Sequence, residues 1–374
     1  MTNTAHFEIF LSIPPGLERA GKREAKEKGF ENPKAVQGGV VFQGGWEDVW
    51  CANLTLRSPS KILARIGEFR VVHLAQLDKK ARQFPWGNYL HQGCAIRVDA
   101  TCRRSKIYHE KAVKQRFETA LKEEFKAQID PKADIKIQLR IEDNICIVSL
   151  DTSGELLHKR GNKQALNKAP MRENLAALFL GLAKFNGEET VLDPMCGSGT
   201  FILEAAEMAS GLYPGRNRSF AFEYFKSFNE KKWQQLKQSQ TAKKPDTRFF
   251  GSDKDAGAIR ISKQNAQSAD IEAISHFENI DIEELVPPDC APGLVIANPP
   301  YGARIGNMKQ LHALYALFGL VMKKRFQGWR IAIITNEQAL ADATKLSFTS
   351  TSPIIDHGGI KVKLYVYDPE KAKS

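Results

Sequence analysis

The chain has 374 residues, two to three times the length of a typical domain, so we expect more than one hydrophobic core and exclude a small single binding module. Its 42% hydrophobic and 26% charged residues are typical of a folded globular protein and exclude a disordered or fibrous one. The net charge of +11 is concentrated in residues 57–116, where 14 Lys or Arg stand against 4 Asp or Glu. Such a basic segment is compatible with nucleic-acid binding and with an ordinary solvated face.

The longest apolar stretches, residues 174–183 and 311–322, are shorter than the roughly 18 residues that span a bilayer. The first twelve residues lack the pattern of a secretory signal. The six cysteines are scattered without CxxC spacing, which favours neither a zinc site nor a disulfide framework. We therefore expect a cytoplasmic protein with no membrane association and no metal.

Short strands and helices alternate in the first part of the chain. Apolar alternation predicts strands at 7–12, 38–43, 94–102, 135–141 and 145–150, and helical spacing predicts helices that begin near Leu17 and cover 46–56 and 110–126. This composition is typical of small α+β domains.

From about residue 170 the pattern changes to strands separated by longer helices. We predict strands at 190–192, 249–252, 277–280, 294–297 and 330–335, with helices at 173–184, 200–210, 256–269 and 310–324. Such alternation predicts a parallel, doubly wound sheet, which residues 361–367 would close as an antiparallel edge strand. The polar stretch 211–248 interrupts the pattern and is interpreted as a surface insertion.

The first motif, Asp193 to Thr200 (DPMCGSGT), lies between a predicted strand and a predicted helix. Gly197 and Gly199 would let the backbone turn sharply and approach a ligand, and the helix N-terminus offers free amide donors. A nucleotide-type cofactor fits this position. A plain Gly-rich turn is the alternative, and the missing third glycine counts against a nicotinamide cofactor.

Two acidic residues follow the next predicted strands. Asp253 ends the second strand, where an acidic residue commonly binds ribose hydroxyls, although it could also be only a helix cap. Its distance from Gly199 exceeds the usual ~20 residues, and the stretch 211–248 accounts for the excess. Asp281 follows the third strand, where it could contact an adenine edge.

The most specific motif, Asn298 to Gly302 (NPPYG), comes directly after the strand 294–297. Two prolines stiffen the loop and supply no amide hydrogen. The Asn298 side-chain oxygen and the Pro299 carbonyl could accept both hydrogens of a planar NH2 group, which leaves the nitrogen lone pair aimed at an electrophile. Tyr301 offers an aromatic face for a base.

These motifs, in this order, resemble those of class I S-adenosylmethionine-dependent methyltransferases that modify exocyclic amino nitrogens. Over nearly its whole length the chain resembles RNA methyltransferases with an N-terminal THUMP domain, and in particular the N-terminal half of the bacterial 23S ribosomal RNA guanine-N2 methyltransferases. The matching stretches include VQGGVVF at 36–42 and LDTSGELLH at 150–158. Ala303 departs from the family, which usually has Glu there, so any contact made by that carboxylate is absent.

The resemblance implies S-adenosylmethionine as the cofactor, with Asp193, Gly197 and Gly199 at its methionine end, Asp253 at the ribose and Asp281 at the adenine. The full expected cofactor set is Pro170, Asp193, Pro194, Cys196, Gly197, Gly199, Thr200, Asp253, Asp281 and Asn298. Asn298, Pro299 and Tyr301 are the expected catalytic residues that receive the target base. Arg103, Arg104 and Lys106, after the strand 94–102, are expected to bind RNA.

The expected fold is a Rossmann-like α/β methyltransferase domain with a mixed seven-stranded sheet at 158–374. It would follow a ferredoxin-like α+β subdomain at 1–56 and a THUMP RNA-binding domain at 57–157. The expected reaction is direct methyl transfer to the N2 of a flipped-out guanine in 23S ribosomal RNA or a large-subunit precursor. Some relatives carry a second methyltransferase domain, and from this chain alone we expect methylation of one site.

Three other functions stay open at this point. The Asn-Pro-Pro-Tyr loop would also suit an adenine-N6 methyltransferase acting on DNA or RNA, and the domain pairing would suit a tRNA guanine methyltransferase. A non-catalytic RNA-binding assembly factor is the third. The sequence specifies neither the target nucleotide nor the oligomeric state.

Overall fold

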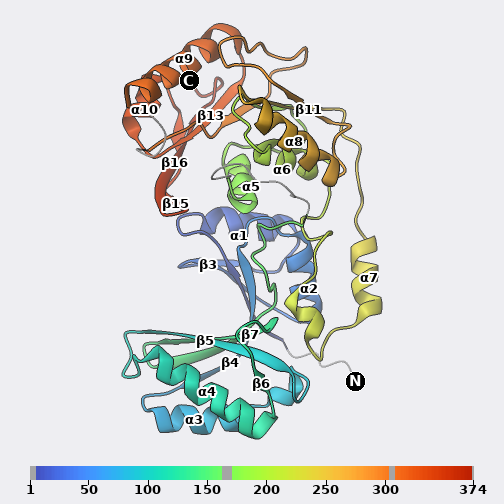
Figure 1. The fold of residues 1–374 in the computed structure, drawn as a ribbon, viewed down its shortest axis with the longest axis vertical. Coiled ribbons are helices and arrows are strands. Elements are labelled where there is room, and N and C mark those ends of the chain that lie inside the picture. The colour runs from blue at the N-terminus through green and yellow to red at the C-terminus, as the bar shows by residue number, and fades with distance from the viewer. Residues whose placement is uncertain (1–5, 162–170, 303–307, 373–374) are drawn as a thin grey trace. The chain divides into compact units, whose positions relative to one another are not determined.

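A computed structural model of the chain describes residues 6–161, 171–302 and 308–372 (Figure 1). The chain divides into two compact units. The first consists of the residues up to Ile13, Lys22–Leu157 and Arg218–Ser239, and the second of Pro14–Gly21, His158–Asn217 and the residues from Gln240 onward. No helix within the described ranges is long and apolar enough to cross a membrane.

The first unit is built on one continuous eight-stranded sheet with the order β2-β3-β1-β4-β8-β7-β5-β6. Its strands are β1 Phe7–Ser12, β2 Lys34–Val36, β3 Gly39–Gly44, β4 Lys61–Arg70, β5 Ala95–Arg103, β6 Gln128–Ile129, β7 Ile135–Glu142 and β8 Ile145–Asp151. The helices along this part of the chain are α1 Glu18–Glu27, α2 Trp46–Thr55, α3 Leu74–Gln83 and α4 Glu110–Phe125, with a 3-10 turn at Trp86–Asn88.

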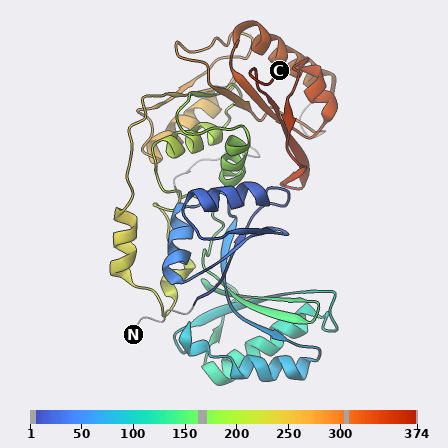
Figure 2. The same ribbon diagram turned by 180° about the vertical axis from the view of Figure 1, so that it is seen from behind.

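Strand β4 was not predicted, and it joins the two halves of this sheet. It pairs antiparallel with β1 on one side and with β8 on the other, and a register shift between Arg65 and Gly67 marks an irregularity near its middle. Ile62 and Ala64 are fully buried while Lys61, Leu63 and Arg65 alternate with them on the other face. The sheet is therefore apolar on one face, which α3 and α4 cover in the β4, β5 and β7 region (Figures 1 and 2).

The prediction that 211–248 forms a surface insertion is wrong for its middle part, which belongs to the first unit. The segment forms a 3-10 turn at Ala221–Tyr224 and α7 at Glu230–Gln238. Phe222 is fully buried between Trp50 of α2, with ring centroids 6.1 Å apart, and Trp233, at 5.1 Å. The aromatic side chains of this otherwise polar segment bury apolar area against α2, which a solvated insertion would not do.

The second unit contains a mixed sheet of seven strands in the order β11-β10-β9-β12-β13-β16-β14, with a short eighth strand, β15, paired to β16. The strands are β9 Val191–Asp193, β10 Phe249–Ser252, β11 Ser275–Glu278, β12 Leu294–Ala297, β13 Arg330–Thr335, β14 Ser350–Thr351, β15 Ile355–His357 and β16 Ile360–Tyr367. The strands β9 to β13 pair in parallel, and β16 pairs antiparallel with β13. The expected mixed Rossmann-like sheet is confirmed.

Two details of this sheet differ from the prediction. Strand β16 is not the edge, because β14 pairs with its far side. Strand β14 has only two exposed residues, so it leaves no apolar pattern in the sequence. The third strand lies at 275–278 instead of 277–280, because Ser275 and Phe277 are the buried pair and Asn279 already turns away to donate its side-chain N–H to the Asp253 carbonyl at 2.7 Å.

The helices of the second unit lie on both faces of its sheet. They are α5 Glu173–Leu182, α6 Thr200–Ala209, α8 Ala256–Ser268, α9 Met308–Arg325 and α10 Gln338–Ala343. Helices α5, α6 and α8 lie on one side, and α9 and α10 on the other (Figures 1 and 2). The direction of winding reverses between β9 and β12, and ligands of open α/β sheets bind at such a switch point.

Candidate active site

The two most specific motifs follow the two strands of this switch point. The loop of Asp193 to Thr200 leaves the carboxyl end of β9, and the loop of Asn298 to Gly302 leaves the carboxyl end of β12, its parallel neighbour. Because parallel strands end at the same edge, both loops emerge at one edge of the sheet. The sequence motifs are therefore brought to a common site.

The two glycines of the first loop have different roles. Gly197 has φ +54 and Gly199 has φ +82, so both adopt left-handed conformations. A Cβ at Gly197 would point into open space, whereas one at Gly199 would lie 3.1 Å from the Phe277 ring. Gly197 thus keeps a cradle open, as expected for a ligand site. Gly199 also packs closely against Phe277, and its expected place at the cofactor stays a prediction.

The loop is held on the second strand by Asp253. Its Oδ2 accepts the Gly197 backbone N–H at 3.0 Å, and its Oδ1 accepts the Asp255 N–H at 3.0 Å. The Cys196 N–H donates to the Ser252 carbonyl at 2.9 Å. Asp255, and not Asp253, caps α8 by accepting the Gly257 N–H at 2.7 Å. The alternative reading of Asp253 as only a helix cap is therefore wrong.

Asp193 is a buried carboxyl at the start of the loop. Only 2% of it is exposed, and its Oδ1 accepts the Met195 N–H at 3.0 Å. Burial raises the pKa of this carboxyl to about 8, the nearby Asp253 charge adds to the rise, and the Met195 hydrogen bond opposes it. A buried carboxyl with a single hydrogen bond can accept further hydrogen bonds from a ligand or pair with a positive charge.

Helix α8 supplies two residues that the sequence reasoning missed. Ser262 Oγ donates to the Gly197 carbonyl at 2.8 Å, and Asn265 Nδ2 donates to the Ser198 carbonyl at 3.1 Å. Both side chains lie on the buried face of the helix together with Ile259 and Ala266. A polar pair at i, i+3 on an otherwise apolar helix face was the signal that could have found them.

The loop after β12 presents an unused acceptor. Asn298 Oδ1 is buried and has no hydrogen-bond partner within the described residues. Such atoms are rare in folded proteins and call for an explanation. The neighbouring Pro299 and Pro300 have no amide hydrogen, so the loop offers acceptors and few donors.

Tyr301 is fixed by a residue from the β15–β16 hairpin. Its ring is 8% exposed, and its hydroxyl lies 3.0 Å from His357 Nδ1. Burial raises the pKa of the phenol to about 12, so it stays neutral at physiological pH. Gly302, at φ +82, follows in a left-handed conformation.

Asn336, directly after β13, is a second amide at this edge that sequence reasoning missed. Its Nδ2 lies 4.0 Å from where a Gly302 Cβ would stand, which places it beside the Asn-Pro-Pro-Tyr loop. Its Oδ1 is also buried without a partner among the described residues. It directly follows the strand predicted at 330–335, and this position, together with the register of β12 and β13, was the signal that could have indicated it.

The remaining predicted cofactor residues lie as follows. Pro194, Cys196 and Thr200 are buried in or next to the first loop. Asp281 is exposed three residues after β11 and accepts the Glu283 N–H at 3.3 Å. Pro170 lies outside the described residues. The roles assigned to these residues stay predictions.

The predicted RNA-binding residues Arg103, Arg104 and Lys106 are all exposed; Arg103 is the last residue of β5, and the other two follow it. The Arg104 guanidinium donates to Glu142 at 2.7 Å and to Asp143 at 3.2 Å, which ties the loop to the β7–β8 turn. Arg104 thus already has carboxylate partners. Contact between these residues and RNA stays a prediction.

The site fits S-adenosylmethionine on structural grounds. The open cradle at Gly197 admits a ligand, and the buried Asp193 and partly buried Asp253 supply carboxylates for a cationic, hydroxyl-bearing molecule. Within the described ranges no group of three or more His, Cys, Asp or Glu could hold a metal ion.

Comparison with known proteins assigns the family. A family model described as RMKL-like, methyltransferase domain, matches residues 160–361, more than half of the chain. The chain belongs to the RMKL-like methyltransferase family. Two further models match this RMKL-like protein, the RlmL ferredoxin-like domain at 8–63 and the THUMP domain at 72–151. The expected combination of modules is confirmed.

Its relatives include proteins of two lengths. A putative RNA methyltransferase of Synechocystis is 30% identical over 370 residues, which cover 96% of each chain. The ribosomal RNA large subunit methyltransferase K/L of Psychromonas ingrahamii is 32% identical over 346 residues, which cover 88% of this chain and 46% of that protein. The chain thus spans about half the length of the K/L methyltransferases that it matches.

Similar solved structures extend over the same range. A putative methyltransferase complexed with SAH has a TM-score of 0.88 and 26% identity, with 97% of this chain and 98% of that chain covered. A predicted N6-adenine-specific DNA methylase from Listeria monocytogenes has a TM-score of 0.85 and 26% identity, with 97% and 96% covered. The expectation of S-adenosylmethionine as cofactor of this RMKL-like methyltransferase is confirmed.

Proposed function

We propose that the protein transfers a methyl group from S-adenosylmethionine to the exocyclic N2 of a guanine in RNA, with 23S ribosomal RNA or a large-subunit precursor as substrate. The observation that carries this proposal is the buried, unpartnered Asn298 Oδ1 at the switch point. An acceptor without a donor in the protein is suited to the N–H of an incoming amino group.

The chemistry assigned to the chain is mainly positioning. The cofactor supplies an electrophilic methyl group when bound. Asn298 Oδ1 and the Pro299 carbonyl accept the two amino hydrogens, which directs the nitrogen lone pair. Tyr301 stays protonated at neutral pH and shapes the base pocket, held by His357. No strong general base is required, because the proton of the methylated amino group is acidic enough to leave to water.

Asn336 favours guanine over adenine. Guanine has an N1–H donor next to its N2 amino group, whereas adenine N1 next to the N6 amino group is an acceptor. The second unpartnered oxygen, Asn336 Oδ1, suits the guanine N1–H. A site built to hydrogen-bond such a group rejects a base that lacks it.

RNA as the substrate class rests on the THUMP domain and on the names of relatives. The chain matches a THUMP domain at 72–151, and its relatives include ribosomal RNA large subunit methyltransferases and a putative RNA methyltransferase. Arg103, Arg104 and Lys106, within the basic segment 57–116, would supply charge for phosphates. The target guanine would be single-stranded or flipped out, because pairing hides its amino group.

Adenine N6 is the second candidate. One similar structure is named a predicted N6-adenine-specific DNA methylase, and Asn298 by itself recognises an NH2 group in either base. Label transfer from S-adenosylmethionine to purified 23S RNA, tRNA and DNA, followed by nucleoside mass spectrometry, tests both. N2-methylguanosine in 23S RNA supports the proposal, and N6-methyladenosine or label only in tRNA or DNA contradicts it. Cofactor binding without turnover on any nucleic acid would favour a non-catalytic protein.

A further inference from the structure

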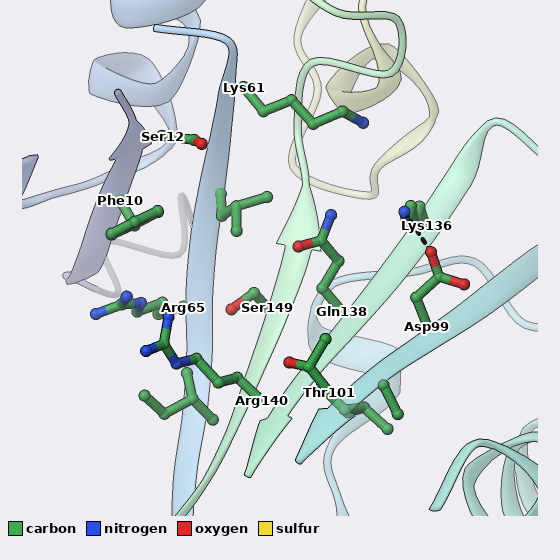
Figure 3. A pocket seen from close by; sticks show the side chains of 14 residues that line it. Phe10, Ser12, Lys61, Arg65, Asp99, Thr101, Lys136, Gln138, Arg140 and Ser149 are labelled. Carbon is green, nitrogen blue, oxygen red and sulfur yellow. Dashed lines mark ion pairs between the residues drawn. The ribbon is translucent and has the colours of Figure 1, made fainter. Parts of the chain in front are cut away.

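The sheet of the first unit has an open face that carries a groove of about 340 Å³ (Figure 3). Its side chains alternate with the buried ones along β1, β4, β8, β7 and β5, so they project from one face. A solvated polar face is usual for such sheets. Here, however, several cationic side chains are partly buried in the groove: those of Lys61, Arg65 and Lys136 are only 18–19% exposed.

Positive charge exceeds negative charge on this face. The strand pairings place seven cations (Lys61, Arg65, Arg70, Arg97, Arg103, Lys136 and Arg140) and five carboxylates (Glu8, Glu68, Asp99, Glu142 and Asp151) on it. Between them stand neutral groups that both donate and accept hydrogen bonds, namely Ser12, Thr101, Gln138 and Ser149. This mixture suits a ligand with anionic groups and polar edges.

Arg65 forms a stacking platform. Its guanidinium lies 4.5 Å from the centroid of the Phe10 ring, and it is paired with Glu8 through one nitrogen, Nη1. Phe10 is buried, the Arg65 side chain packed over its ring is only partly exposed, and both residues line the groove. Nucleic-acid bases stack on guanidinium planes of this kind.

Arg140 reaches the same end of the groove from another strand. Strands β4 and β7 flank β8, and Figure 3 shows the guanidinium groups of Arg65 and Arg140 at one end, with Lys61 at the other. Arg140 donates Nε to Glu142 at 2.9 Å and also bonds it through Nη2. Each guanidinium has five N–H donors, so these ion pairs fix both groups while leaving donors for a phosphate.

We propose that this open face binds single-stranded RNA, with a base stacked on the Phe10–Arg65 platform and phosphates on Arg65 and Arg140. The proposal rests on the proposed RNA methyltransferase function and assigns the surface that holds the substrate away from the reacting base. A single strand is favoured over a duplex because amide and hydroxyl groups line the groove. They can hydrogen-bond the Watson–Crick edges of unpaired bases, and pairing in a duplex already occupies those edges. An acidic protein partner is the rival occupant.

The test measures binding of the full-length protein to a fluorescein-labelled, unstructured RNA and to the same RNA annealed to its complement, as a function of salt. Arg65→Gln/Arg140→Gln removes two groove charges, and Lys80→Gln/Lys122→Gln removes two exposed charges from α3 and α4, on the other face. Arg65→Lys/Arg140→Lys keeps the charges but loses the planar groups.

We expect the groove glutamine variant to weaken single-strand binding on the order of tenfold and to lower the slope of log affinity against log salt by about 1.4, or 0.7 per phosphate. The lysine variant should weaken binding while keeping the slope, and the α3–α4 variant should match the wild type. Duplex binding as tight as single-strand binding, or equal losses in the groove and α3–α4 variants, overturns the inference.

Photocrosslinking of the wild type with 4-thiouridine RNA keeps the test decisive if a variant does not fold. Crosslinked peptides from β1, β4 or β7 support the groove, and crosslinks confined to other elements refute it. If the wild type binds RNA through another surface, only the proposal for the groove is refuted. If the wild type binds no RNA, the proposed function is contradicted as well. Loss of an acidic protein from the groove variant with unchanged RNA affinity supports the rival occupant and overturns the inference.

Discussion

Replacing Asn298 by alanine should separate turnover from stability. The substitution removes the acceptor that orients the amino group, and misorientation at reacting atoms costs on the order of a hundredfold in rate, or about 2.7 kcal/mol in the barrier. In the free protein the same oxygen is buried without a partner among the described residues, which carries a desolvation cost of roughly 1–3 kcal/mol. Its removal offsets the lost packing, so we expect the free energy of unfolding to fall by no more than about 1 kcal/mol.

The rate is measured as single-turnover methylation at saturating RNA and cofactor, and the stability by equilibrium urea denaturation. Both affinities should change little, since Pro299 and Tyr301 remain. Asn298→Asp keeps an acceptor oxygen in the same place and should lose less rate than the alanine variant. Asn186→Ala, in an exposed turn of the same unit, is the matched control and should leave the rate unchanged.

Two results would refute this reasoning. A wild-type single-turnover rate in Asn298→Ala would show that the oxygen does not orient the reacting group. An aspartate variant as slow as the alanine variant would show that the acceptor is not what the reaction needs.

The remaining predictions concern the cofactor loop and the aromatic segment. Gly197→Val should abolish S-adenosylmethionine binding in calorimetry at a stability cost of about 1–2 kcal/mol for its left-handed backbone, whereas Gly199→Val should lose most of its melting transition because its side chain meets Phe277. Phe222→Ala should lower the free energy of unfolding by about 3–5 kcal/mol in urea, and a loss under 1 kcal/mol would contradict its docking on α2. The pKa of Asp193 is raised to about 8, so the stability that its protonated form contributes is lost as pH rises from about 4 to 8. The stability of Asp193→Asn relative to the wild type should therefore rise between pH 5 and pH 8. If the free energies of unfolding in urea of the two proteins change in parallel with pH, the raised pKa of Asp193 is wrong.

The sequence by itself determined the inner parallel strands of the methyltransferase sheet and the place of its motifs. Each of its inner strands is a short apolar run followed at once by a Gly, Asp or Asn, as at Asp193 and Asn298, so the strand and the site residue are local features of one segment. Right-handed winding of parallel strands then leaves few ways to order them, which is why the two loops could be expected at one edge.

Strand β4 and the segment 218–239 lacked such local signals. Lys61 and Arg65 face the open side of the sheet, so charge masked the buried Ile62 and Ala64 between them. In the segment 218–239 the aromatic residues are spread through polar sequence without a helical or strand period. Their burial depends on Trp50, far away in the chain, and only the folded structure brings the two together.

The finer parts of the site were likewise decided by tertiary structure. Ser262 and Asn265 hold the glycine loop from a helix, and Asn336 and His357 reach the Asn-Pro-Pro-Tyr loop from β13 and a hairpin. None of them lies in a motif, because a hydrogen bond between distant segments constrains geometry and not the neighbouring sequence. The physical reason is general: a motif records what a backbone turn requires locally, whereas an unpartnered oxygen or a contact across strands exists only once the sheet has set its register.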